Sequence, residues 1–182
     1  MREFDVEEIK EFALEVYGRL SDDSIPVFLC VGSDKFIADS LAPIVAEILV
    51  NKYNVPAYVY GGLEYNINGN NLAFVTNYVE CEHPRSQIIL IDATLSDNVG
   101  KVVVTNGSFA GLGKILPIRK IGNFSILGVV GKRGKTFQLN TTRLGIIKNL
   151  AHFIAKGIAM ALFAKWQYKK TKISTLFDKI AK

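Results

Sequence analysis

Two near-continuous apolar runs, joined and followed by segments with helical periodicity, restrict this chain to a small set of folds. Residues 25–31 (IPVFLCV) and 87–91 (QIILI) lack the alternation of a strand with one wet face. Such runs are typical of parallel strands that are covered on both faces. Because helical patterns separate the predicted strands, the order is βαβαβ. This order predicts an α/β protein, a three-layer α/β/α fold with a mostly parallel mixed sheet.

The other elements are predicted from their periodicity and end signals. Apolar residues recur at three-to-four spacing in residues 5–20, which indicates an amphipathic helix. Pro43 is tolerated only in the first turn of a helix, so we expect a helix over 39–53. Asn68 is a candidate N-cap for a helix over 70–81. The remaining expectations are strands over 57–60, 99–105, 125–130 and 136–139, a helix over 141–167, and one more short helix in the tail.

Charge is distributed unevenly along the 182 residues. Residues 165–182 carry six lysines and one aspartate, so they account for the whole net charge of +5. We therefore expect a single domain over 1–164, followed by a lysine-rich tail that is solvated rather than bound to nucleic acid. No Asp or Glu stands between Asp97 and Asp178, so acid chemistry must use the first half of the chain.

Nothing in the chain predicts a membrane or secreted protein. The N-terminus is acidic and amphipathic, without the basic start and apolar stretch of a signal peptide. Residues 144–166 form the most apolar helical segment, but three lysines and a histidine interrupt it, which favours a buried helix. Cys30 lies in an apolar run and Cys81 near a helix end, and two scattered cysteines make no disulfide framework. We expect a cytoplasmic protein, no membrane partner, and cysteines that pack rather than react.

An aspartate follows each apolar run, and these two acids are the candidate catalytic residues. Ligands of open α/β sheets bind outside the carboxyl ends of the strands, where Asp39 and Asp92 are expected. If the strands are neighbours, the carboxyls meet and share a proton, which suits water activation and protonation of a leaving group. Helix capping explains Asp39 equally well, whereas an acid that ends a buried strand usually binds or reacts. Asp34 is assigned to turn chemistry, with a supporting role left open.

Other kinds of site find little support. His83 precedes the strand that leads to Asp92 and is expected about 20 Å from it, and His152 is expected to pack in mid-helix. No metal-ligand triad emerges, so we expect no metal and no other cofactor. Ser33 has no histidine partner for a Ser-His-Asp system. Residues 107–113 (GSFAGLG) lack the strand-then-helix context of a phosphate loop and are interpreted as a loop near the site.

Five sequence blocks carry a resemblance to a known family. They are CVGSDKFIADSLAPIV, YGGLEYNINGNNL, ILIDATL, LPIRKIGNFSILGVV and LNTTRLGIIKNLAHFIAKGI. In this order and spacing, over roughly residues 25–162, the chain resembles the YyaC-type sporulation proteins, which are often described as spore protease-like. That family is similar to the germination protease and, more remotely, to the hydrogenase maturation peptidases. The resemblance implies a phosphorylase/hydrolase-like α/β/α fold.

The resemblance also implies which residues act. The two acids implicated in peptide cleavage by the germination protease fall on Asp39 in ADSLAP and on Asp92 in IDAT. Departures from the family pattern are Ala42 for a glycine, Asn123 for an acid, and Asn66 and Asn68 for a proline and a histidine. Because the nickel-recognising histidine of the maturation peptidases has no counterpart, a nickel-dependent role is disfavoured.

Residues and resemblance together predict a sporulation-associated, peptidase-like hydrolase in which Asp39 and Asp92 activate water. Asp34 is expected to orient one of them, and the loops around Glu64 and over 107–114 to bind a peptide or protein substrate. The predicted supporting set also includes Ser33 and Asn123. The alternative is a non-catalytic sporulation binding protein on the same fold. A nucleic-acid role of the lysine-rich tail is a third interpretation, and homo-oligomerisation is left open.

Overall fold

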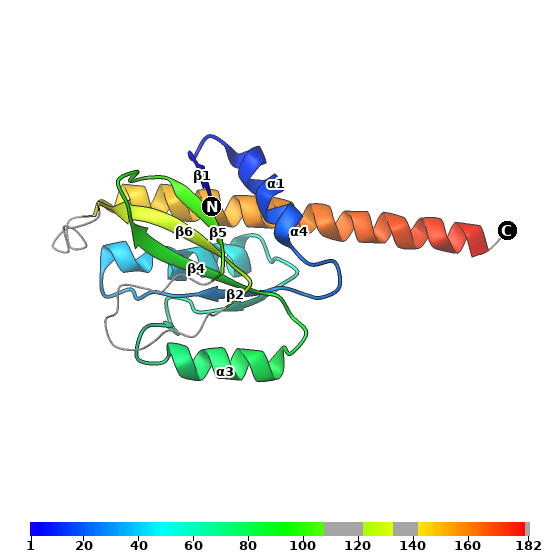
Figure 1. Ribbon diagram of the computed structural model, residues 1–182, viewed down its shortest axis with the longest axis horizontal. Coiled ribbons are helices and arrows are strands. Elements are labelled where there is room, and N and C mark those ends of the chain that lie inside the picture. The colour runs from blue at the N-terminus through cyan, green and yellow to red at the C-terminus, as the bar shows by residue number, and fades with distance from the viewer. Residues whose placement is uncertain (108–121, 133–141, 181–182) are drawn as a thin grey trace.

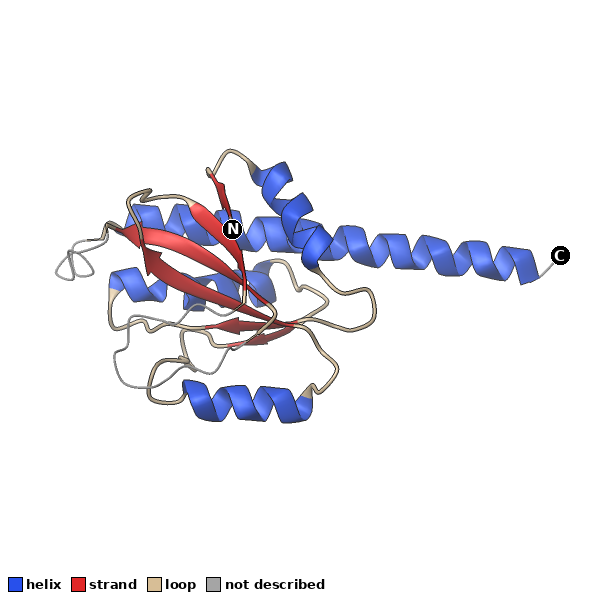
Figure 2. Cartoon of the chain, viewed as in Figure 1, coloured by secondary structure: helices blue, strands red, loops and turns tan. Residues whose placement is uncertain are grey.

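Helices lie on both sides of a twisted central sheet (Figure 1). The computed structural model describes residues 1–107, 122–132 and 142–180, with side chains as far as residue 171. One face of the sheet is covered by α1 (Ile9–Arg19), α2 (Leu41–Glu47) and α4 (Leu144–Ile180), and the other by α3 (Leu72–Glu82) (Figure 2). The predicted three-layer α/β/α architecture is confirmed.

The sheet is mixed and mostly parallel, as predicted. Its strands are β1 (Arg2–Phe4), β2 (Val27–Cys30), β3 (Tyr58–Tyr60), β4 (Ile88–Leu95), β5 (Val102–Asn106) and β6 (Phe124–Gly131), in the spatial order β1-β5-β6-β4-β2-β3. β2 is parallel to both β3 and β4, and β4 is parallel to β6. β5 runs antiparallel to β6 and β1. The two apolar runs of the sequence therefore form neighbouring strands, as a meeting of Asp39 and Asp92 requires.

Burial on both faces explains why β2 and β4 are apolar throughout. Phe28 and Ile89 point into the larger core, which includes residues of α1, α2 and α4. Leu29 and Leu90 point the other way, into the core that includes Val79 of α3. Side chains alternate between the faces of a strand, so both faces need apolar residues here.

Several elements differ from the sequence prediction in extent. The strand predicted over 87–91 continues to Leu95 because β6 pairs with it along this length. The helix predicted over 39–53 is α2 flanked by a 3₁₀ turn, η1 (Ile37–Ser40), and a π-helical turn, η2 (Ile48–Lys52). The N-cap of α3 is Asn71 rather than Asn68. The strand predicted over 136–139 lies outside the described residues.

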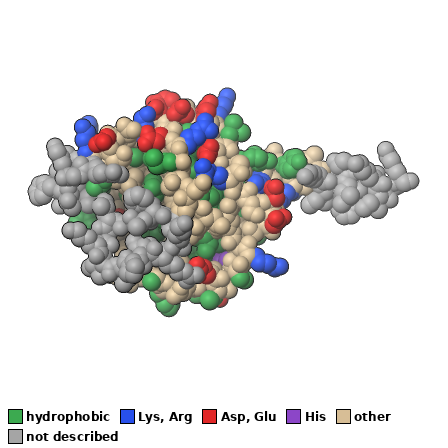
Figure 3. All heavy atoms as spheres, viewed as in Figure 1, with side chains coloured by type: hydrophobic (Ala, Val, Ile, Leu, Met, Phe, Trp, Pro, Cys, Tyr) green, Lys and Arg blue, Asp and Glu red, His purple; other side chains and the backbone are tan. Residues whose placement is uncertain are grey.

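The N-terminal strand β1 is absent from the sequence prediction. Only Phe4 of its three residues is buried, so β1 shows no recognisable apolar pattern. Its position is fixed by tertiary contacts with α1. The Phe4 and Phe12 rings meet edge to face at 5.5 Å, and Arg2 pairs with Glu15 at 3.2 Å. Figure 3 shows charged side chains of both signs gathered over this part of the molecule.

Helix α4 is the longest element and ends outside the body of the domain. It has 37 residues and runs without a break to Ile180, so the separate short helix predicted for the tail is wrong. Figure 1 shows its C-terminal part projecting beyond the sheet. Residues 144–171 are long and apolar enough to cross a membrane by length and composition alone, yet 61% of the apolar window is buried in the structure. Burial of this kind is typical of the core helix of a globular domain.

Candidate acid-pair site

Asp92 lies inside β4 rather than past its end. The sequence interpretation of Asp92 as the residue that ends its strand is therefore wrong, because β6 extends the pairing and places Leu127 opposite Asp92. On its other side, however, β2 stops at Cys30, opposite Ile91. Asp92 thus stands one position beyond the end of β2, at the carboxyl edge where open α/β sheets bind ligands.

The surroundings of Asp92 strongly favour its neutral form. By strand alternation its side chain shares the α3-covered face with Leu90, and the residue is 8% exposed. Burial raises the pKa of Asp92 to about 8, the backbone N–H of Ala93 opposes this shift, and the nearby charge of Asp39 adds to it. That N–H donates to Asp92 Oδ1 at 2.7 Å. At neutral pH, Asp92 is therefore a carboxylic acid that can donate a proton.

Asp39 is held near this edge by the turn that follows β2. It belongs to η1, and its carbonyl accepts the backbone N–H of Ser33 at 3.1 Å. Asp39 is half-buried; burial raises its pKa, and the backbone of Ser33 partly lowers it. The capping interpretation of Asp39 is wrong, because the N-caps of η1 and α2 are Phe36 and Ser40.

The two carboxyls influence each other electrostatically, since the charge of Asp39 contributes to the raised pKa of Asp92. Like charges at close range disfavour double ionisation, so such a pair holds one proton over a wide pH range. In this state Asp39 can accept a proton while Asp92 donates one. The arrangement is suited to general acid–base catalysis of hydrolysis.

Two predicted supporting residues lie in the turn after β2. Ser33 is buried, contacts Asp39 through its backbone, and accepts the N–H of Lys35 on Oγ at 3.2 Å. Asp34 is exposed, and its Oδ1 accepts a hydrogen bond from Asn66 Nδ2 at 2.8 Å. Asp34 therefore ties this turn to the loop after β3, which is a different contact from the predicted orientation of a catalytic acid.

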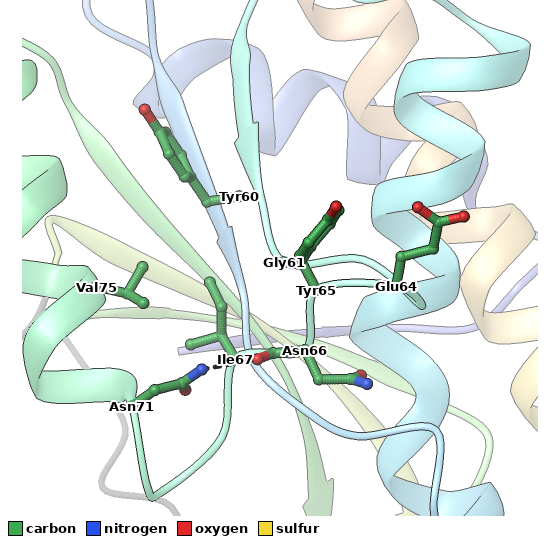
Figure 4. Close-up of a pocket in the computed structure, with 8 residues that line it drawn as sticks. All are labelled: Tyr60, Gly61, Glu64, Tyr65, Asn66, Ile67, Asn71 and Val75. Carbon is green, nitrogen blue, oxygen red and sulfur yellow. Dashed lines mark hydrogen bonds between the residues drawn. The ribbon is translucent and has the colours of Figure 1, made fainter.

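Glu64 lines a pocket of about 360 Å³ at the carboxyl end of β3 (Figure 4). The other lining residues are Tyr60, Gly61, Tyr65, Asn66, Ile67, Asn71 and Val75. The sequence prediction placed only Glu64 of this set in substrate binding. The signal for the rest was the Gly61-Gly62 break, which ends β3, followed by an unusual run of aromatic and amide residues.

Asn123 lies away from the acid pair. Its Oδ1 accepts the N–H of Ile88 at 2.9 Å, and its own N–H donates to the Ile88 carbonyl at 2.8 Å. Ile88 begins β4, four residues before Asp92, and a strand rises by about 3.3 Å per residue. Asn123 therefore joins β4 to β6 at the opposite end of the strands and is not retained as a supporting residue.

Of the two cysteines, Cys30 is buried and Cys81 is exposed, so the expectation that both pack is wrong for Cys81. His83 stacks on Tyr58 and is hydrogen-bonded to the Tyr60 hydroxyl at 2.8 Å. His152 is exposed on α4, so the prediction that it packs is wrong. Burial raises the pKa of the Cys30 thiol, which keeps it protonated. Within the described ranges, no group of three His, Cys, Asp or Glu side chains comes together to hold a metal. The predicted loop over 107–114 falls outside these ranges, apart from Gly107.

An open, mostly parallel sheet with a buried Asp92 and a half-buried Asp39 at its carboxyl edge defines an α/β protein with a candidate acid–base site. The chain belongs to the family described as a protein of unknown function (DUF1256), whose model matches residues 3–157. It is similar to the uncharacterized protein YyaC of Bacillus subtilis (strain 168), with 29% identity over 151 residues, covering 79% of this chain and 73% of the relative. These similarities confirm the YyaC-type resemblance.

Proposed function

We propose that this protein is a peptidase-like hydrolase that uses Asp39 and Asp92 to activate water. The observation that carries the proposal is the pKa of Asp92, raised to about 8 by burial and by the charge of Asp39. A neutral acid beside an ionised one is the state that acid–base hydrolysis requires near neutral pH.

In the proposed reaction, Asp39 takes a proton from water as the water oxygen bonds to the substrate carbonyl carbon. Asp92 donates its proton to the carbonyl oxygen, which gives a neutral tetrahedral intermediate. Asp39 then passes its proton to the leaving nitrogen as the C–N bond breaks, and Asp92 recovers a proton from the collapsing intermediate. The pair returns to its starting state, and one water has been consumed for each amide bond cleaved.

A role in spore formation or germination, inside the sporulating cell, belongs to the same proposal. It is supported by the YyaC-type resemblance and by the similarity to a Bacillus subtilis protein of that name. The substrate in this proposal is a peptide or protein, because the resemblance to the germination protease is carried by the two acids that the hydrolytic scheme uses.

The test is cleavage of a complex peptide mixture by the purified full-length chain, with new termini identified by mass spectrometry. Asp39→Asn and Asp92→Asn should each lower the cleavage rate by about 10²-fold or more, because each removes one acid–base partner. Asp23→Asn is the matched control, since Asp23 is an exposed loop acid. Full activity of Asp92→Asn, measured on folded protein, would remove the proposal.

The second candidate is a non-catalytic binding protein on the same fold. The observation that favours it is the structural use of Asn68 and Asn123 where the family pattern has other residues. Asn68 Oδ1 accepts the N–H of Asn70 at 3.0 Å, and Asn123 joins β4 to β6. This function predicts a partner from sporulating cells that wild type and Asp92→Asn retain equally in a pull-down, together with no cleavage by either.

A further inference from the structure

The pocket beside β3 opens at the same sheet edge as the acid pair. Its wall residue Ile67 forms a parallel bridge with Val31, and the Ile67 carbonyl accepts the N–H of Gly32 at 2.7 Å. Val31 in turn donates its N–H to Ile91, the neighbour of Asp92, at 2.8 Å. Adjacent strands lie about 4.8 Å apart, so Ile67 is roughly 10 Å from the backbone of β4. If an extended peptide lay with its scissile bond at the acid pair, a long side chain beside that bond could reach the pocket across this distance.

The walls of the pocket suit a long side chain with an apolar stem. Figure 4 shows Tyr60 and Tyr65 on either side of Gly61, with Ile67 and Val75 lining the space below Tyr60. Gly61 has φ +89°, and a Cβ there would lie 2.1 Å from the Cys30 carbonyl oxygen. Gly61 therefore cannot carry a side chain, because its backbone packs directly against β2.

The pocket carries a negative charge, and several of its polar groups can accept hydrogen bonds. Glu64 is charged, and no Lys or Arg stands among the lining residues that the structure describes. Asn66 uses its Nδ2 to donate to Asp34 Oδ1 at 2.8 Å and to the Leu63 carbonyl at 3.3 Å. These two acceptors fix the orientation of the amide, and Asn66 Oδ1 is left buried without a donor within the described part of the chain.

From these contacts we infer that the pocket seats a basic side chain, Arg or Lys, of the peptide substrate beside the scissile bond. The aliphatic stem packs on Ile67 and Val75, and the cationic head lies against the tyrosine rings and Glu64. Ammonium and guanidinium groups bring only donors, which complement the Glu64 carboxylate and the acceptor lone pairs of the tyrosine hydroxyls. The inference rests on the proposed function, because the peptide it places is the hydrolase substrate.

Binding of synthetic peptides tests this inference without relying on turnover. The probes are capped alanine pentapeptides with Arg, Lys, Leu or Glu at the centre, titrated into full-length Asp92→Asn protein and followed by backbone amide shifts of residues 60–75. Arg and Lys peptides should bind about tenfold more tightly than Leu and Glu peptides. Glu64→Gln should reduce this preference to roughly threefold or less, and Tyr65→Ala should weaken the Arg and Lys peptides.

Glu11→Gln is the matched control, because Glu11 is an exposed acid on α1, across the sheet from α3. It should leave the preference unchanged. Equal binding of all four peptides, tighter binding of the Leu peptide, or shifts confined to other segments would overturn the inference.

Cleavage of the same peptides by wild type separates the two proposals. If Arg and Lys peptides bind at residues 60–75 and remain intact, the pocket inference stands and the hydrolase proposal fails. If wild type cleaves the peptides without preferring a basic residue, the hydrolase proposal stands and the pocket inference fails.

Discussion

At the scale of single residues, the decisive property is the burial of a carboxyl group that keeps its proton. Asp92 accepts one backbone N–H, and this single bond does not offset the loss of hydration. The sequence predicted that Asp39 and Asp92 would come together if their strands were neighbours, because each follows an apolar run. It could not predict the burial of Asp92, which depends on β6 extending the sheet past β2. Asn123 was misplaced because its family position does not reveal which end of the strands it occupies.

The raised pKa of Asp92 predicts a stability that falls with rising pH. The Asp92 carboxyl has a pKa of about 8 in the folded state and of about 3.9 in the unfolded state. The unfolding free energy should therefore decrease as the pH rises between these two values. The slope is at most about 1.4 kcal/mol per pH unit for one proton. Asp92→Asn removes the group, so the difference in unfolding free energy between variant and wild type should grow from pH 5 to pH 8. Urea unfolding at several pH values measures it.

Asp39→Asn serves as the partner control for this experiment. It removes the charge that adds to the raised pKa of Asp92 but leaves the burial, which is the larger cause. The unfolding free energy of Asp39→Asn should therefore fall with rising pH almost as much as that of wild type. If the Asp92→Asn and wild-type curves run parallel from pH 5 to pH 8, Asp92 does not hold a proton in the folded state.

At the scale of elements, the sequence predicts those whose pattern is set locally and misses those set by tertiary contacts. The buried strands β2 and β4 follow from their continuous apolar runs, and the helices α1 and α3 follow from helical patterns and end signals. β1 does not, because one buried residue in three makes no pattern. The continuation of α4 to Ile180 was missed because the lysine-rich sequence after Gln167 suggested a break, whereas lysine is a good helix former.

The contact between α1 and α4 offers a test of helix packing. A Cβ on Gly157 of α4 would lie 2.2 Å from Phe12 Cδ1, so Gly157→Ala should lower the unfolding free energy by about 1–3 kcal/mol through overpacking. Gly145→Ala in the same helix is the matched control. Among the described residues, the helix's own backbone aside, no atom lies within 4 Å of the added Cβ there, and the better helix propensity should leave stability unchanged or raise it by up to about 1 kcal/mol. Thermal unfolding compares them, and destabilisation by both variants to the same extent would contradict this packing.

At the scale of the whole molecule, the domain and the projecting part of α4 meet close to the boundary expected from charge. The predicted tail began at Lys165, but that side chain contacts the domain. Its Nζ donates to the carbonyls of Tyr17 and Leu20 and pairs with Asp22 at 3.2 Å. Lys165 is therefore assigned to the domain, and the sequence could not predict this because a lysine in a basic tail carries no sign of its partners.

Removal of the projecting helix should separate these two parts. A chain that ends after Tyr168 keeps Lys165 and its contacts with α1, so its Tm should stay within about 2–4 °C of the full-length value.

Lys165→Met in the full-length chain leaves two carbonyls and Asp22 without their cation, so it should lower the unfolding free energy by about 1–2 kcal/mol. Lys169→Met is the matched control, because Lys169 is exposed, and it should change the unfolding free energy by less than about 0.5 kcal/mol. Differential scanning calorimetry of the three proteins measures these shifts. If the truncated chain loses far more stability than Lys165→Met, the helix beyond Tyr168 belongs to the folding unit, and the domain extends to the end of α4.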